Sequence, residues 1–170
     1  MPLDFSGGGL DSAGHMGFML MLFALALPVF AFAQALGGQV KRTNPPTLSK
    51  PNGYTHVVEI TGEVRTIYVA GQVALDAAGK VVGAGDMKAQ AQQVFKNLEA
   101  ALAAGGATFR DVVKMNTYIT DITKVPAMRE VRAQYLGDTS PASTLVQIGS
   151  LAAPDFMLEI EVIAVVPAQR

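Results

Sequence analysis

An uncharged, strongly apolar segment at residues 17–33 limits how much of this chain can fold as a globular domain. It reads GFMLMLFALALPVFAFA and is followed by Gln34. Its seventeen residues are at the short limit for a membrane-spanning helix, and Pro28 would break a helix near its end. Ala31-Phe32-Ala33 matches the small-x-small pattern at which signal peptides are cleaved. We therefore predict that residues 1–33 are a secretory signal peptide and that the mature protein starts at Gln34.

One part of the signal-peptide pattern is missing. The first fifteen residues contain no Lys or Arg and carry Asp4 and Asp11, whereas export signals begin with a basic region. Three other interpretations therefore stay open: an uncleaved membrane anchor, a buried core helix, and a translation start at Met16. A functional signal predicts a periplasmic or secreted protein with no membrane association after cleavage, and an unused one predicts a cytoplasmic protein.

The rest of the chain is long enough for one ordinary domain. The full length of 170 residues is too short for two domains of typical size. Residues 41–53 contain three prolines and show no hydrophobic periodicity, which is typical of an extended segment rather than a helix or strand. We predict an extended leader over residues 34–53 and a folded domain over residues 54–167.

Charge and composition exclude several classes of protein. Thirteen basic and fourteen acidic residues give a formal net charge of −1, so the chain lacks the positive excess that favours binding to nucleic acid. The absence of cysteine excludes disulfides, thiolate nucleophiles and cysteine-ligated metals. Because only His15 and His56 could supply imidazole ligands, we expect no metal centre.

Five segments rich in β-branched residues predict strands. Two of them, residues 55–60 and 66–70, are separated by Gly62-Glu63, which predicts a hairpin. A turn at residues 76–79 should return the chain through Val81-Val82. The other predicted strands are residues 112–120, 144–148 and 157–165.

Two segments predict amphipathic helices. The first follows Asp86, a good N-cap residue, and ends at Gly105-Gly106. The second begins near Pro126, which suits a first helical turn, and ends at Gly137. Apolar residues recur at helical spacing in both: Met87, Ala91, Val94, Phe95, Leu98 and Leu102 in the first, and Val125, Met128, Val131, Tyr135 and Leu136 in the second.

The resulting element order, β-β-α-β-α-β-β, predicts an α+β domain with a mixed sheet and two helices packed on one face. In the last strands, apolar residues occupy both the odd-numbered and the even-numbered positions, which point to opposite faces of the sheet. The face without helices should therefore also be covered. Because no third helix is predicted, we expect another subunit to cover that face.

Several short motifs lie along residues 51–166. They are Asn52-Gly53-Tyr54, Val69-Ala70-Gly71-Gln72, Asp86 before a Gln-rich helix, Val113-Lys114, Pro141–Val146 (PASTLV), Gly149-x-Leu151 and Leu158–Glu161 (LEIE). Together they resemble the reactive intermediate deaminase family (Rid, or YjgF-type). The resemblance implies a chorismate-mutase-like fold and a homotrimer with three clefts between subunits. It also implies hydrolysis of small enamines or imines to a carbonyl product and ammonia, without a cofactor.

The resemblance implies roles for three residues. Tyr54 falls at the family's pocket tyrosine, Gly71 where a backbone group faces the ligand, and Glu159 at the carboxylate that positions the attacking water or shuttles a proton. Each also has a simpler interpretation: Tyr54 could anchor the leader on the core, Gly71 could be a turn glycine, and Glu159 could be solvated. However, Glu159 and Glu161 share one side of their strand, the side that an oligomer should cover.

Four pocket positions depart from the family pattern. Ser143 stands where the resemblance places an arginine that grips the substrate carboxylate, Leu145 replaces a cysteine, and Ala70 replaces a serine. A serine offers one neutral hydrogen bond in place of a charge-assisted pair, so this pocket should favour a neutral or less acidic ligand. Arg129 stands at an asparagine position on the second helix; it would restore positive charge if it faces the pocket, and is otherwise an exposed helix residue.

The resemblance and these departures from it together leave two functions open. The first is a hydrolytic deaminase in which Glu159 acts as the general acid–base and backbone groups near Gly71 orient the substrate. The second is a non-catalytic trimer that binds a small ligand in the same clefts, which the loss of the arginine favours. Ribonuclease activity, attached by name to part of the family, is poorly supported by the balanced charge and the two histidines.

Overall fold

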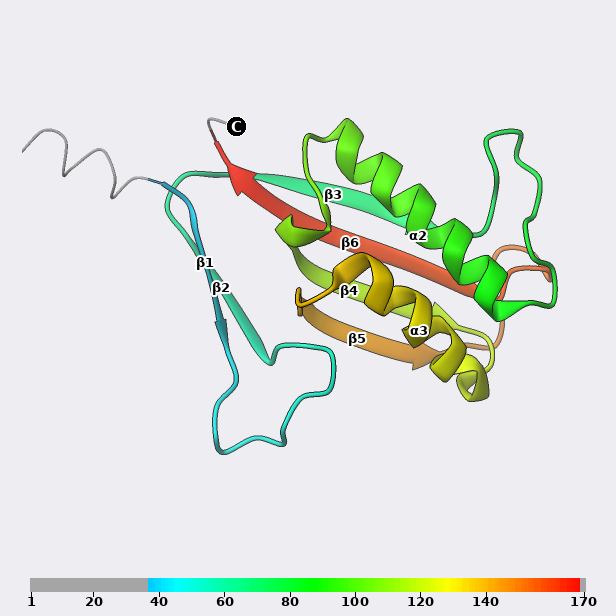
Figure 1. Cartoon of the computed structure of the whole chain (residues 1–170), viewed down its shortest axis with the longest axis horizontal. Helices are drawn as coiled ribbons and strands as arrows, with labels where there is room; N and C mark the ends of the chain where they lie inside the picture. The colour runs from blue at the N-terminus through cyan, green and yellow to red at the C-terminus, as the bar shows by residue number, and fades with distance from the viewer. Residues whose placement is uncertain (1–36, 169–170) are drawn as a thin grey trace, which may run out of the picture. The chain divides into compact units, whose positions relative to one another are not determined.

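The main sheet has four strands in the order β3-β6-β4-β5 (Figure 1). The β4–β5 pair is parallel, and the β3–β6 and β6–β4 pairs are antiparallel. The computed structural model describes residues 37–168, so the predicted signal peptide at residues 1–33 lies outside the described residues. The strands of this sheet are β3 (Val64–Gln72), β4 (Val112–Ile119), β5 (Ala142–Gln147) and β6 (Leu158–Pro167).

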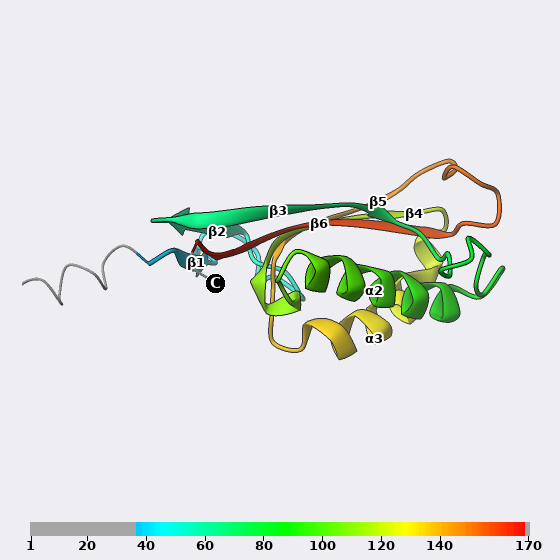
Figure 2. The same cartoon turned by 90° about the horizontal axis from the view of Figure 1, so that it is seen from above.

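Two helices, α2 (Met87–Ala104) and α3 (Val125–Leu136), both lie on one face of this sheet, as predicted (Figure 2). The side chain of Asp86 caps α2 by accepting hydrogen bonds from the backbone N–H groups of Lys88 and Ala89. The six apolar positions predicted in α2 are all buried, and so are those in α3 except Tyr135, which is half-buried. The predicted helices are therefore confirmed.

The predicted hairpin between residues 55–60 and 66–70 is wrong. The strand β2 (Val57–Thr61) pairs instead with β1 (Gln39–Thr43) in a separate two-stranded sheet, where Lys41 Nζ lies 3.7 Å from Glu59 Oε2. After the turn at Gly62, β3 pairs with β6, whose alternating buried residues offer it a long apolar partner. The strand β1 lies within residues 34–53, the segment predicted to be an extended leader without helices or strands.

The predicted return through Val81-Val82 is also shorter than expected. The turn at residues 76–79 forms, with Gly79 N–H donating to Asp76 O at 2.9 Å. Beyond it, Val81 makes only a single bridge to Leu75, not a strand. The observed order is therefore β-β-β-α-β-α-β-β, which adds β1 to the predicted set.

A buried glutamine on α2 joins the helix to the loop that leads into β6. Gln90 is fully buried; its Nε2 donates to Asp155 O at 2.6 Å, and its Oε1 accepts from Met157 N–H at 2.9 Å. Both backbone groups lie just before β6, so this side chain fixes where that strand begins. Phe95, one turn further along α2, stacks on Tyr135 of α3 with the ring centroids 5.2 Å apart.

The opposite face of the sheet carries no helix within residues 37–168 (Figure 2). On it, Tyr68 of β3 is 77% exposed and Val146 of β5 is 40% exposed. In the same part of the chain, no helix is both long and apolar enough to cross a bilayer.

Candidate functional site

Four of the predicted site residues, Tyr54, Arg129, Ser143 and Leu145, line one cavity of about 190 Å³, which we call the arginine cavity. It lies among α3, β5 and the loop before β2. Its other lining residues are Asn52, Gly53, Thr117, Met128, Arg132 and Thr144. Within one chain, these four of the predicted site residues therefore lie together.

Two hydrogen bonds from Thr55 hold the loop of Tyr54 against the segment just before β5. The buried Thr55 donates from its N–H to Pro141 O at 3.1 Å and from Oγ1 to Ser140 O at 2.7 Å. The Tyr54 ring also meets the His56 ring edge to face, with centroids 5.1 Å apart. Tyr54 therefore both lines the cavity and lies in an anchored segment, so the two interpretations of this residue are compatible.

The charge of the arginine cavity comes from α3. Arg129 is exposed, and Arg132, one helical turn further on, is half-buried and donates from Nη2 to Gly53 O at 2.6 Å. Desolvation by burial, and then the positive charge of Arg129, lower the pKa of the Arg132 guanidinium. Arg132 was not among the predicted site residues, although its spacing of three from Arg129 places both on one side of a helix.

Glu159 and Gly71 lie together on the sheet face that has no helices. Asn116, Tyr118 and Glu161 lie on the same face, and we call the surface formed by these five residues the carboxylate face. The pairing register of β3 with β6 shifts just before Gln72. A Cβ atom at Gly71 would overlap the Glu159 carboxylate. Gly71 is therefore required for close approach of a side chain, a more specific role than a turn glycine.

Glu161 is the centre of a hydrogen-bond network on the carboxylate face. Its Oε1 accepts from Asn116 Nδ2 at 2.7 Å and from the Tyr118 hydroxyl at 3.2 Å. Burial, the hydrogen bond to Glu161 and the two nearby carboxylates raise the pKa of Tyr118, so the phenol stays protonated, and a donor to Glu161, to a higher pH than an ordinary tyrosine. Asn116 and Tyr118 were not predicted from the sequence. The pattern that could have indicated them is the alternation of these partly exposed residues with buried residues along β4.

Two cavities lie along the carboxylate face. One, of about 390 Å³, is lined by Tyr118, Ile148, Ser150, Leu151, Ala152, Glu159 and Glu161. The other, of about 330 Å³, contains the predicted residue Ala70 and is lined also by Tyr68, Val69, Lys114, Asn116, Glu161, Val162 and Ile163. Neither includes a residue of the arginine cavity. Within one chain, the predicted site residues therefore form two separate groups.

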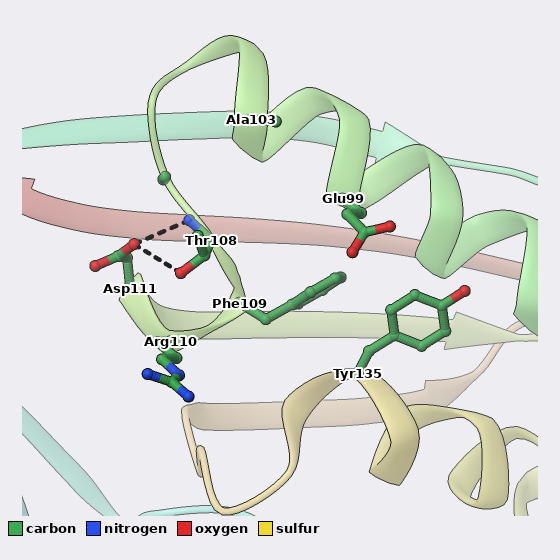
Figure 3. A pocket seen from close by; sticks show the side chains of 8 residues that line it. Glu99, Ala103, Thr108, Phe109, Arg110, Asp111 and Tyr135 are labelled. Carbon is green, nitrogen blue, oxygen red and sulfur yellow. Dashed lines mark hydrogen bonds between the residues drawn. The ribbon is translucent and has the colours of Figure 1, made fainter.

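A larger cavity of about 660 Å³ lies between the end of α2 and the end of α3 (Figure 3). It contains none of the predicted site residues. Phe109 and Tyr135 form an edge-to-face pair there, and Asp111 Oδ2 accepts from the N–H and Oγ1 of Thr108, which caps a short 3-10 helix. Because these groups pack the helix ends, we do not assign the site to this cavity despite its size.

Within residues 37–168, no group of three or more His, Asp or Glu side chains is arranged to hold a metal ion. The polar groups that line the described cavities are carboxylates, guanidinium groups, hydroxyls, amides and the ammonium group of Lys114.

Substituting Gly71 with alanine should lower any activity that depends on Glu159. The new methyl group would displace the carboxylate, and misplacing a reacting group by about 1 Å costs on the order of 100-fold in rate. We expect kcat to fall by roughly 10- to 100-fold while the melting temperature changes little. Gly37→Ala is the control, because a Cβ there meets nothing within 4 Å. Equal activity of the two variants would contradict the close approach of Glu159 to Gly71.

Comparison with known proteins gives a consistent result. A family model described as endoribonuclease L-PSP matches residues 47–166. The 2-iminobutanoate/2-iminopropanoate deaminase of Dermatophagoides farinae is 30% identical over 122 residues, which cover 71% of this chain and 92% of that protein. The 3-aminoacrylate deaminase RutC of Acinetobacter baylyi is 34% identical over 98 residues, which cover 58% of this chain and 77% of that protein.

The fold is also found among solved structures. A Yersinia pestis protein of the conserved Rid protein family, of unknown function, matches with 36% identity and a TM-score of 0.67 over 75% of this chain and 98% of that chain. The predicted fold class is thereby confirmed: an α+β, chorismate-mutase-like fold with a mixed sheet and two helices on one face.

Proposed function

The chain belongs to the endoribonuclease L-PSP family of Rid or YjgF-type proteins, and from this premise we propose that it hydrolyses small imines and enamines to a carbonyl compound and ammonia. Two relatives named above are deaminases of an imine or an enamine. The reaction needs a water molecule held in position and a group that transfers protons. Protein side chains can do both without a cofactor.

The observation that carries the proposal is the state of the Glu159 carboxylate. It is half-buried, lines a cavity of about 390 Å³, and makes no hydrogen bond or ion pair within residues 37–168. Its neighbour Glu161, in contrast, accepts hydrogen bonds from Asn116 and Tyr118. A half-buried carboxylate that has no hydrogen-bond partner among these residues is available to a water molecule and to a substrate nitrogen.

The proposed chemistry is a balanced hydration and elimination. An enamine first takes a proton on carbon and gives up an N–H proton, which converts it to the imine. Glu159 then accepts a proton from water as the oxygen bonds to the imine carbon, and passes that proton to the nitrogen to give the carbinolamine. As the C–N bond breaks, the carbinolamine hydroxyl gives its proton through Glu159 to the leaving nitrogen, so that water and imine yield one carbonyl compound and one ammonia. Because such imines hydrolyse readily on their own, positioning of the water and a single acid–base suffices.

We further propose that the reaction takes place at clefts between subunits of a homotrimer. The two groups of site residues line different cavities in one chain. The carboxylate face also lies on the sheet surface without helices, where Tyr68 and Val146 are exposed. A neighbouring subunit that covers this face would bring its arginine cavity to Glu159. Each cleft would then take the carboxylate from one chain and the arginines from another.

Binding of a small ligand without catalysis is the second candidate, favoured by Ser143 at the position where the resemblance places an arginine. Ribonuclease activity, which the family model's name mentions, is disfavoured by the formal charge of −1 and by the two histidines of the chain. We also propose that the protein works without nucleic acid as a partner.

The test is an assay of ammonia release from imines generated in situ by an amino-acid oxidase. We expect ammonia to appear faster than in the uncatalysed reaction, with protein that behaves as a trimer in sedimentation equilibrium. Saturable binding without any rate increase would replace the deaminase with the ligand-binding alternative. A monomer at micromolar concentration would refute the clefts between subunits.

A further inference from the structure

The two glutamates on the carboxylate face turn toward different neighbours of β6. They lie two residues apart on this strand, which runs between β3 and β4. Glu159 approaches β3, where a Cβ atom at Gly71 would overlap its carboxylate. Glu161 instead contacts β4, whose Asn116 and Tyr118 donate hydrogen bonds to it. Both carboxylates line the cavity of about 390 Å³, so a water molecule there could meet either of them.

The pairing of β4 with β6 explains how Tyr118 reaches Glu161. In the antiparallel register, Asn116 lies opposite Glu161, whereas Tyr118 lies opposite Glu159. The Asn116 amide therefore donates straight across the strands, with its Nδ2 2.7 Å from Glu161 Oε1. The Tyr118 hydroxyl reaches the same oxygen diagonally, at 3.2 Å. Tyr118 thus lies beside both carboxylates of the cavity, and its hydroxyl donates to Glu161.

A carboxylate of Glu161 without these donors would compete with Glu159. Two carboxylates that approach each other share protons and titrate as a pair, so neither keeps a role of its own as acid or base. No Lys, Arg or His is among the residues that line this cavity, so no cation there separates the two charges. The donors from β4 hold Glu161 instead, and hydrogen bonds to an ionised acceptor are stronger than those between neutral groups.

We propose that Tyr118 is a positioning residue, which holds Glu161 against β4 and so leaves the attacking water to Glu159 alone. This inference rests on the proposed function, in which Glu159 is the acid–base. Tyr118 acts through Glu161 and takes no part in the proton transfers.

The first test measures turnover of imines by Tyr118→Phe, alone and combined with Glu161→Gln. Phenylalanine keeps the ring and removes the donor, so Glu161 can turn toward Glu159. We expect kcat to fall by roughly 5- to 10-fold and KM to stay within about twofold of wild type, because the hydroxyl binds Glu161 and not the substrate. Adding Glu161→Gln should bring kcat back to within about threefold of wild type, because a neutral amide cannot compete for the water proton.

Tyr135→Phe is the matched control. Tyr135 is half-buried, like Tyr118, but lies on α3 in the separate cavity shown in Figure 3. Its substitution removes the same hydroxyl group and should leave kcat within about twofold of wild type. The proposal would be overturned by equal defects in Tyr118→Phe and Tyr135→Phe, or by a defect in Tyr118→Phe that Glu161→Gln does not relieve.

A second test does not depend on turnover. The ionisation of Tyr118 is read as the difference between ultraviolet titrations with and without Tyr118→Phe, in wild type and in Glu161→Gln. Burial, and after it the hydrogen bond and the charge of Glu161, raise the pKa of Tyr118. Glu161→Gln should therefore lower this pKa but leave it above the ordinary value of about 10, because burial remains. An unchanged pKa would show that Tyr118 does not hold Glu161.

The outcomes separate this proposal from the deaminase function. If wild type releases no ammonia, the deaminase is rejected, and the titration of Tyr118 alone decides whether Glu161 is held against β4. If wild type and Tyr118→Phe are equally active, the deaminase stays and the positioning role of Tyr118 is rejected.

Discussion

Glu159→Gln is expected to lower kcat for imine hydrolysis by roughly 100-fold or more, the usual contribution of a general acid–base. The amide keeps the size of the side chain but cannot take a proton from water. The substituted group also stays beside Gly71, so the fold and the cavity should be preserved.

The matched control for this experiment is Glu99→Gln. Glu99 is an exposed carboxylate that lines the larger cavity at the end of α2 (Figure 3). Its substitution removes the same charge and should leave kcat within about twofold of wild type. If Glu99→Gln abolished turnover and Glu159→Gln did not, the site would belong to that larger cavity and the assignment to the carboxylate face would be wrong.

Gln90→Met should destabilise the protein by about 2–4 kcal/mol. Methionine has a similar length but cannot replace either hydrogen bond, so Asp155 O and Met157 N–H would be left buried without their partner. Leaving a buried backbone group unsatisfied costs about 1–3 kcal/mol for each group. Chemical denaturation, with the slope compared between variants, measures the effect.

Gln92→Met on the same helix provides the control. Gln92 is exposed and lies two residues after Gln90, so its substitution should change stability by no more than about 0.5 kcal/mol. Equal effects of Gln90→Met and Gln92→Met would show that the contacts to the loop before β6 contribute little. A loss of activity in Gln90→Met at temperatures where it remains folded would show that the loop also positions Glu159.

The sequence predicted the helices well because their signals are local. Asp86 caps α2 and Gly137 ends α3, and the apolar residues between them recur at a spacing that only a helix turns into one face. Strand pairing was harder. The turn at Gly62 has the composition of a hairpin, yet β3 pairs with β6, far away along the chain. Which strand pairs with β3 depends on the other strands that the fold brings near it, and the residues of the turn carry no information about those strands.

The same difference explains what was predicted of the site. Glu159 and Tyr54 were found through motifs, but a motif does not say which residues share a cavity. Arg132 was missed because it belongs to no motif, and its importance appears only when α3 packs beside the loop that carries Gly53. Tyr118 was missed because a tyrosine in a strand is ordinary until its hydroxyl is seen to reach Glu161.

The parallel pairing of β4 with β5 through α3 also bears on how such a protein can diversify. Arg129, Arg132, Ser143 and Leu145 all lie on α3 and β5, the later parts of one strand–helix–strand unit. Glu159 lies on β6, outside that unit. Substitutions in a short contiguous stretch of the gene can therefore move a positive charge from strand to helix, or remove it, while the strand that carries the carboxylate is inherited unchanged. Under the proposed function, a lineage built on this arrangement can change its ligand specificity while the strand that carries the proposed acid–base stays the same.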